Sequence, residues 1–255
     1  QTACDLATRG LASMCIDWRG QGLADRLLDD PLVGHVDSFT DYQKDVAALM
    51  RAARALALPR PYFLLAHSMG GCIGLRAVME GMSVKAAAFT GPMWGIHLKP
   101  HLRGVAQFLS NVMPRFGRGH QLPPGTTTEP YVVSAPFEDN LLTTDAEMYD
   151  MMRDQLAAHP ELALGGPSYV WLREALAETH HLAERAAPNL PAMTWLGTNE
   201  RIVSTPPIHE RMEHWVGGRL EMVEGAEHEI LMEGPQIRTQ ALDGIEKLFL
   251  GTVTA

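Results

Sequence analysis

The run Leu64-Leu65-Ala66-His67-Ser68-Met69-Gly70-Gly71 has the residue types of a nucleophile turn. An apolar stretch leads into it, and a stretch compatible with a helix follows. A serine at such a sharp strand-to-helix turn is held on a strained backbone that projects its hydroxyl clear of the sheet. We expect small residues at Ala66 and Gly70 because larger side chains would collide across the turn. The pattern predicts Ser68 as a nucleophile; the alternative is an ordinary turn with a surface serine.

A serine hydroxyl attacks well only if a base takes its proton and a third group orients that base. Of the 11 histidines, His228 lies in a loop after the last strand-like run, where ligands bind in α/β sheets. Glu200 follows the preceding strand-like run and completes the chain order serine, acid, histidine. The alternatives are a solvated loop histidine and a loop carboxylate paired with Arg201. Because His67 directly precedes Ser68, we expect it near the pocket rather than in the role of base.

Acyl transfer also needs donors for the oxyanion of its transition state. The backbone N–H of Met69, directly after the nucleophile, should supply one. The second normally comes from a loop upstream of the helix that opens this sequence. Since Gln1 is no initiator, we expect that such a loop and earlier strands are missing. Loss of one donor typically costs about 2.7–4 kcal/mol, so the segment alone should be weakly active or inactive.

Short, continuous apolar runs predict strands buried in a parallel sheet. These runs cover residues 12–16, 62–66, 84–89, 193–196 and 220–223. Helical spacing lies between them, from Val46 to Leu56, over 71–79, and after Pro235. The alternation of strands and helices predicts an α/β fold with an open, doubly wound and mostly parallel sheet.

The alternation breaks between Pro92 and Pro191, where Gly and Pro clusters separate short helical pieces. Two of these pieces cover residues 146–158 and 169–187. The stretch is too long for a loop. The predicted organisation is therefore a core in two parts, residues 1–91 and 192–255, with a helical cap, residues 92–191, inserted between them.

Composition bounds the possible functions. The chain has 255 residues and a formal net charge of -9, and without a basic stripe it should bind no nucleic acid. No apolar run reaches the roughly 18 residues of a spanning helix. Three cysteines without metal-ligand spacing, Cys4, Cys15 and Cys72, are expected as small buried thiols in a reducing compartment.

Two further features are ambiguous. His209 and His214 are five residues apart, about 140° around a helix, whereas a zinc helix places histidines four apart. We therefore expect no metal there. Trp94, after the run that enters the insertion, could line a substrate pocket, although burial alone would equally explain it.

These motifs resemble the α/β-hydrolase superfamily, and more closely its bacterial lysophospholipase and monoacylglycerol lipase branch, also described as serine aminopeptidase-like hydrolases. The resemblance runs from the first helix to the end of the chain. It is carried by residues 16–22 (Ile-Asp-Trp-Arg-Gly-Gln-Gly), 66–71, 197–203 and 224–231. It implies Ser68 as nucleophile, Glu200 as acid, His228 as base and Met69 as oxyanion donor. Many relatives carry Asp at the position of Glu200, and relatives begin with earlier strands.

The resemblance implies a serine hydrolase of carboxylic esters, with lysophospholipids or monoacylglycerols as substrates and an acyl-enzyme on Ser68. It implies no metal and no organic cofactor. His67 and Trp94 are its candidate pocket residues. The alternatives are a C–C bond hydrolase, a cofactor-free haloperoxidase, or an inactive truncated domain. We expect a cytoplasmic protein; contact with the inner membrane and the oligomeric state are left open by the sequence.

Overall fold

A computed structural model describes residues 1–253 of the chain. Helices and strands alternate in the N-terminal and C-terminal parts of the chain. Between β2 and β3 the named elements are all helices, joined by loops. The elements are α1 (Thr2–Thr8), η1 (Phe39–Asp41), α2 (Tyr42–Ala55), β1 (Leu64–His67), α3 (Ser68–Met79), β2 (Ala87–Thr90), α4 (Pro100–Val112), η2 (Met113–Phe116), α5 (Tyr131–Ser134), α6 (Ala146–Ala158), η3 (Pro160–Leu162), α7 (Tyr169–Ala183), β3 (Ala192–Gly197), α8 (Pro206–Glu213), β4 (Gly218–Val223), η4 (Ile230–Met232) and α9 (Pro235–Gly251). Among the described residues, no helix is long and apolar enough to span a membrane.

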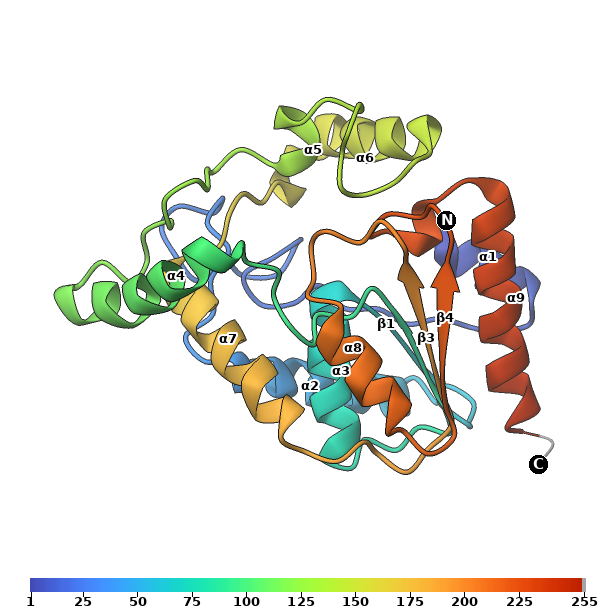
Figure 1. The fold of residues 1–255 in the computed structure, drawn as a ribbon. Coiled ribbons are helices and arrows are strands. Elements are labelled where there is room, and N and C mark those ends of the chain that lie inside the picture. The colour runs from blue at the N-terminus through green and yellow to red at the C-terminus, as the bar shows by residue number, and fades with distance from the viewer. Residues whose placement is uncertain (254–255) are drawn as a thin grey trace.

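The sheet has four strands in the order β1-β2-β3-β4, and every neighbouring pair is parallel. The pairs start in register at Leu64 with Ala87 and at Ala87 with Ala192. All four carboxyl ends therefore meet at one edge, as the arrows in Figure 1 show. The predicted α/β class is confirmed, and four of the five predicted strands are present.

Helices cover both faces of this sheet. In Figure 1, α1 and α9 lie on one side of it, and α2, α3 and α8 on the other. Each side has its own apolar core. One core gathers Ile73, Leu75, Phe89 and neighbours beneath α3 and α8, and the other gathers residues of α9 around Trp195. This double covering explains why the central strands β2 and β3 are largely apolar, whereas the edge strand β4 carries Arg219 and Glu221.

The predicted strand at residues 12–16 is wrong. This segment has no assigned secondary structure and no ladder to any described strand, and it is mostly exposed. Apolar composition alone does not make a strand, because backbone groups need a partner edge. The expectation of buried thiols also fails for Cys4 and Cys15, which are exposed; Cys72, in α3, is buried, and burial raises the pKa of its thiol.

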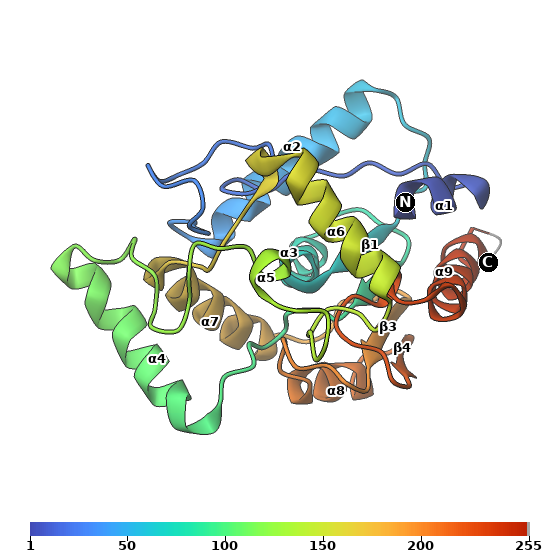
Figure 2. The same ribbon diagram turned by 90° about the horizontal axis from the view of Figure 1, so that it is seen from above.

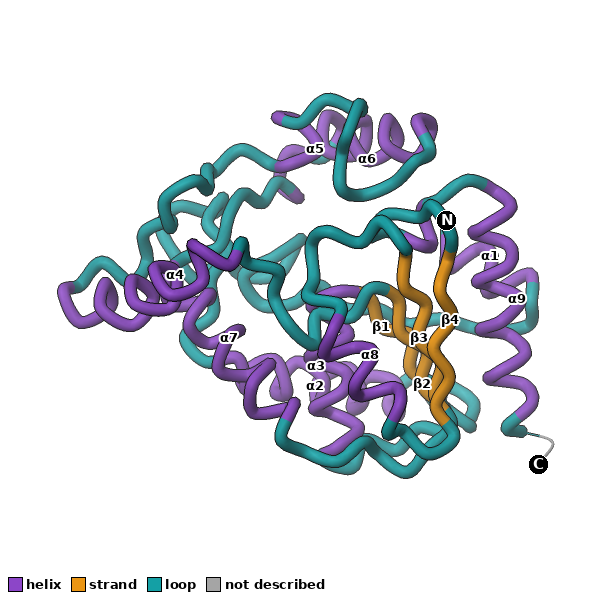
Figure 3. The backbone as a smooth tube through the Cα atoms, in the orientation of Figure 1, coloured by secondary structure: helices purple, strands orange, loops and turns teal. Residues whose placement is uncertain are grey.

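The helical stretch between β2 and β3 lies over the carboxyl edge of the sheet. Figure 3 shows α5 and α6 above the strand ends, and the view from above in Figure 2 shows α6 crossing over α3. Helix α6 has the predicted bounds. Helix α7 ends at Ala183, four residues before the predicted end at Ala187. Pro188 disfavours helical backbone at Ala187, so the helix could not keep its predicted end there.

A buried ion pair ties this stretch to the core. Arg76 of α3 donates to Glu178 of α7, with 2.8 Å between Nη2 and Oε2. Both side chains are nearly inaccessible, at 10% and 5% exposed. The pair raises the pKa of Arg76, because its charged form is held by the Glu178 carboxylate. Helix α7 is thereby fixed against the helix that begins at Ser68.

Candidate active site

Ser68 is the first residue of α3 and directly follows β1. Its φ is +49°, a left-handed conformation that costs a non-glycine residue about 1–3 kcal/mol. The expected collision at Gly70 is wrong, since a Cβ there would meet nothing within 4 Å. The close approach is one residue later, where a Cβ on Gly71 would lie 2.6 Å from the Cβ of Pro92. The small residues therefore let α3 pack on the segment after β2.

Three side chains from distant parts of the chain form one hydrogen-bonded relay. His228 Nε2 lies 2.9 Å from Ser68 Oγ, and His228 Nδ1 lies 2.6 Å from Glu200 Oε2. The His228 and Glu200 side chains are 3% and 1% exposed. Both alternatives from the sequence, a solvated histidine and a carboxylate paired with Arg201, are therefore wrong. The arrangement can take a proton from the hydroxyl and stabilise the resulting imidazolium.

Glu200 is held as a carboxylate on both oxygens. Its Oε1 accepts the backbone N–H groups of Ile202 and Val203, at 2.7 and 3.0 Å. Burial acts to raise the pKa of Glu200, but the hydrogen bonds from His228 and from this backbone outweigh it, so the pKa lies below its ordinary value. The group therefore stays charged beside the imidazole at neutral pH.

His67 lies against the imidazole of His228, with 4.7 Å between ring centroids. Its Nδ1 lies 3.0 Å from Thr90 Oγ1, and its Nε2 lies 3.0 Å from Glu229 Oε1. Burial opposes both charges of this ion pair. The mutual attraction prevails, so the pKa of His67 is raised and the pKa of Glu229 is lowered to about 2. The half-buried His67 is thus a member of a second His–carboxylate pair beside the relay.

The backbone N–H of Met69 belongs to the first turn of α3, where N–H groups have no acceptor within the helix. The positive end of the helix dipole lies at the same place, which favours negative charge. The Met69 side chain accepts a contact from Gln21 Nε2 at 3.5 Å. Gln21 belongs to the motif of residues 16–22. In this motif the side chain of Asp17 accepts the backbone N–H of Leu23, which stabilises the turn.

A cavity of about 670 Å³ lies between α4, α7 and the segment after β2. Trp94 lines it and is 3% exposed, with its ring N–H donated to Gly71 O at 3.2 Å. The neighbouring Met93 donates its N–H to Ser68 O. Trp94, which lines the cavity, is therefore the chain neighbour of a residue that is hydrogen-bonded to Ser68. Its walls combine apolar Trp94 and Leu176 with the polar side chains of Arg103 and Arg173.

Two groups among the described residues have ligand atoms close enough to share a metal ion. One is His35, Asp37 and His120; the other is His67, His228 and Glu229. In the first, His35 Nδ1 already lies 2.7 Å from Ser168 Oγ; in the second, the imidazoles belong to the pairs described above. His209 lies in α8 and His214 directly follows it. Both are exposed, and neither belongs to these two groups.

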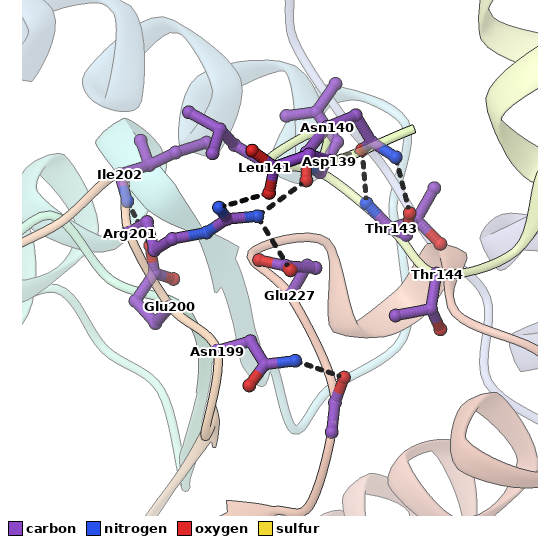
Figure 4. A network of polar contacts seen from close by, with 12 residues as sticks. Asp139, Asn140, Leu141, Thr143, Thr144, Asn199, Glu200, Arg201, Ile202 and Glu227 are labelled. Carbon is purple, nitrogen blue, oxygen red and sulfur yellow. Dashed lines mark hydrogen bonds and ion pairs between the residues drawn. The ribbon is translucent and has the colours of Figure 1, made fainter. Parts of the chain in front are cut away.

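The sequence reasoning missed a polar network around the relay. In Figure 4, Arg201 reaches from the loop of Glu200 to Glu227 and to the segment 139–144, which belongs to the insertion. Glu227 directly precedes His228. The excess of polar residues in 139–144 was the available signal, but nothing in a single sequence pairs that segment with residues 201 and 227.

Known proteins are similar to this chain in sequence and in fold. A family profile described as "Serine aminopeptidase, S33" matches residues 1–235. Lysophospholipase L2 of Escherichia coli K12 is 34% identical over 261 residues, which cover 98% of this chain and 75% of that protein. A probable lysophospholipase L2 of Haemophilus influenzae is 27% identical over 248 residues, with 96% and 77% coverage.

Solved structures agree on the architecture. Monoacylglycerol lipase of Paleococcus ferrophilus superposes with a TM-score of 0.74 at 16% identity, covering 98% of this chain and 88% of that one. A soluble variant of monoglyceride lipase from Saccharomyces cerevisiae, in complex with a substrate analogue, gives 0.70 at 18% identity, with 98% and 80% coverage. The α/β-hydrolase fold implied by the resemblance is thereby confirmed.

Proposed function

This chain belongs to the serine aminopeptidase S33 family and, with its lysophospholipase relatives, is a serine hydrolase of carboxylic esters; we propose that its substrates are lysophospholipids or monoacylglycerols. The relatives named lysophospholipase and monoglyceride lipase support this substrate class. The observation that carries the proposal is the continuous relay from Ser68 Oγ through His228 to Glu200, at 2.9 and 2.6 Å.

The proposed reaction begins at Ser68. His228 Nε2 takes the hydroxyl proton as Oγ attacks the ester carbonyl, and Glu200 stabilises the imidazolium that forms. His228 then gives the proton to the leaving alcohol, which breaks the ester bond and leaves the acyl group on Oγ. Water, deprotonated by the same imidazole, attacks the acyl-enzyme; the bond from the acyl carbon to Oγ breaks, Oγ takes the proton back from His228, and the fatty acid is released. Met69 N–H would hold the oxyanion in both halves of the reaction.

The cavity beside Trp94 supports an amphiphilic substrate. Apolar walls suit an acyl chain, while Arg103 and Arg173 suit a polar or anionic end. We propose that residues 92–191 act as a cap over the carboxyl edge of the sheet and that Trp94 belongs to the substrate pocket. His67, in contact with His228, would form the pocket wall on the other side of the relay.

The surface of α4 supports peripheral contact with a membrane. Leu102, Val105 and Phe108 are 47%, 53% and 63% exposed, and at 100° per residue they share about a third of the helix circumference. Gln107 and Ser110, on the opposite side of the helix, face the cavity. The polar side of α4 therefore faces the protein, and the apolar side faces outward.

Charge favours an anionic lipid surface as the partner of α4. Residues 92–128 contain no Asp or Glu, although the chain as a whole carries a net charge of -9. Their cations are Lys99, Arg103, Arg115 and Arg118, and all four are exposed. Basic side chains beside an exposed apolar helix face suit phospholipid head groups and acyl chains together. We propose that the protein meets its lipid substrates at a membrane surface through α4.

The test uses a fluorophosphonate probe and a substrate panel. The probe should label the protein at one site, and Ser68→Ala should abolish labelling. Lysophospholipids and monoacylglycerols should be hydrolysed in preference to short water-soluble esters, and β-diketones should not react. Labelling that survives Ser68→Ala would reject the nucleophile, and turnover of diketones alone would favour a C–C hydrolase.

A further inference from the structure

One segment of the insertion, residues 139–144, is built into the loop that carries His228. His228 N–H points to Leu141 O at 3.4 Å, and Glu229 N–H donates to Leu142 O at 2.8 Å. The segment is folded on itself by Asn140, whose Oδ1 accepts the N–H groups of Leu142 and Thr143. Figure 4 shows the contact between Asn140 and Thr143. The backbone beside the imidazole is therefore hydrogen-bonded to a segment that is itself held by side-chain hydrogen bonds.

Glu233 accepts hydrogen bonds from both the loop that carries His228 and the segment 139–144. It is fully buried, at 0% exposed. Its Oε1 accepts the N–H of Glu227 at 2.7 Å, and its Oε2 accepts the N–H and the hydroxyl of Thr144 at 2.9 and 2.6 Å. Because donors face both oxygens, only a carboxylate satisfies the site; an amide would turn its own N–H₂ toward one of them. A buried acceptor without this match would cost free energy.

Arg201, in the loop that carries Glu200, contacts both the segment 139–144 and the loop that carries His228. Its guanidinium donates to Asp139 Oδ1 at 2.7 Å and to Asn140 O at 2.9 Å in the insertion, and to Glu227 Oε1 at 3.0 Å beside the base (Figure 4). Glu200 and Arg201 are adjacent in the chain, as are Glu227 and His228. A single side chain thus fixes the spacing between the loop of the acid, the loop of the base and the cap.

We propose that Arg201 and Glu233 are positioning residues, which align His228 with Glu200 and Ser68 through residues 139–144 of the insertion. This inference rests on the proposed roles of those three side chains. The insertion then does more than cover the substrate, because its segment 139–144 completes the support of the catalytic base. A displacement of about 1 Å at reacting groups costs on the order of a hundredfold in rate, so loosening this support should be visible in the chemical step.

The experiment compares Arg201→Leu and Glu233→Gln with the intact protein. The readouts are the fluorophosphonate labelling rate, kcat and KM for a short water-soluble ester, and the deshielded proton resonance of the His228 Nδ1–Glu200 bond. We expect labelling and kcat to fall by about tenfold to a hundredfold with little change in KM, and the resonance to shift. Arg201→Lys, which keeps the charge with fewer donors, should recover part of the rate.

Two variants serve as matched controls. Arg219→Leu removes an exposed arginine whose ion pair, with Glu221, lies away from the network, and it should change none of the readouts. Glu178→Gln perturbs the buried pair with Arg76, so it should lower stability while the folded protein labels at the normal rate. Together they separate loss of alignment from loss of stability.

The outcomes separate the two levels of inference. If Ser68→Ala abolishes labelling while folded Arg201→Leu labels at the wild-type rate with an unshifted resonance, the positioning role is rejected and the proposed function stands. If Glu233→Gln does not fold, Arg201→Leu, at a side chain that is 40% exposed, decides alone. Labelling that persists in Ser68→Ala rejects the proposed function itself.

Discussion

At the scale of single residues, both carboxylate oxygens of Glu200 are occupied, which restricts how this side chain can act. One oxygen holds His228 and the other holds two backbone N–H groups. The loop turns back on itself after Glu200, so that the N–H groups of residues 202 and 203 donate to its carboxylate. The carboxylate is therefore oriented before any substrate arrives.

Glu200→Gln should lower kcat by about 10³–10⁴-fold with little change in KM. An amide can still accept from the backbone, but it then presents N–H₂ to His228 Nδ1 and stabilises the tautomer that cannot accept the serine proton. Stopped assays with a short ester measure kcat, and thermal unfolding checks that the fold is retained. Turnover within a factor of about three of wild type would remove Glu200 from the mechanism.

Glu229→Gln tests the second pair by its pH dependence. The pKa of Glu229 lies at about 2, below its ordinary 4.5, so its stabilisation is present above pH 4.5 and is lost as the pH falls toward 2. The pKa of His67 lies above its ordinary 6.5, so its stabilisation is present below pH 6.5 and is lost as the pH rises through the raised value. The two contributions coincide between these ordinary values.

Urea unfolding of wild type and Glu229→Gln should therefore differ most near pH 5.5 and less near pH 3 and pH 9. The exposed Glu224→Gln serves as the control and should give no such maximum. A difference in unfolding free energy that is constant with pH would show that His67 and Glu229 do not form a charged pair.

At the scale of elements, the end of β3 and the loop of His228 approach closely at Gly197. A Cβ there would lie 2.2 Å from Ala226 O and 2.5 Å from Glu227 O. These are backbone atoms, which cannot rotate away as a side chain would. The strand that leads to Glu200 and the loop that carries His228 therefore keep their spacing only with glycine at this position.

Gly197→Ala should force these two segments apart. We expect a loss of about 1–3 kcal/mol in the free energy of unfolding, together with slower fluorophosphonate labelling of the protein that remains folded. Urea denaturation and labelling kinetics measure the two effects. Gly104→Ala, in an exposed part of α4 where a Cβ meets nothing within 4 Å, should instead be neutral or stabilising. Equal behaviour of both variants would contradict the close approach.

The same scale explains what the sequence could predict. Strand-to-helix turns are local, so Ser68 and the first turn of α3 followed from a run of eight residues. His228 and Glu200 followed because parallel strands end at one edge. The exposed segment 12–16 had the composition of a strand but no partner, and pairing is a property of the tertiary structure. The contacts of Arg201 and Glu233 with residues 139–144 join segments far apart in the chain, so no local pattern indicates them.

At the scale of the whole molecule, the exposed apolar face of α4 lies in a stretch of the chain without negatively charged side chains. Although the chain is acidic, residues 92–128 carry no carboxylate, and this stretch includes the outward apolar face of α4. Figure 1 shows α4 standing away from the sheet, on the far side of the core from α9. Because residues 139–144 contact the backbone of His228 and Glu229, docking of α4 on lipid would bring the proposed catalytic base close to the membrane surface.

The double variant Phe108→Asp, Phe116→Asp should separate membrane docking from chemistry. The two rings are 63% and 76% exposed, and each should contribute about 1.5–3 kcal/mol when buried in lipid, so binding to anionic vesicles should fall at least about tenfold. Hydrolysis of monoacylglycerol in vesicles should fall in parallel, while kcat for a short soluble ester stays unchanged. Val216→Asp, at an 83% exposed apolar residue outside this surface, should change neither, because exposure alone does not make a docking site. Equal vesicle binding by the double variant and wild type would rule out α4 as the docking surface. In that case, loss of binding at high salt concentration would show that charge alone attracts the protein to the vesicles.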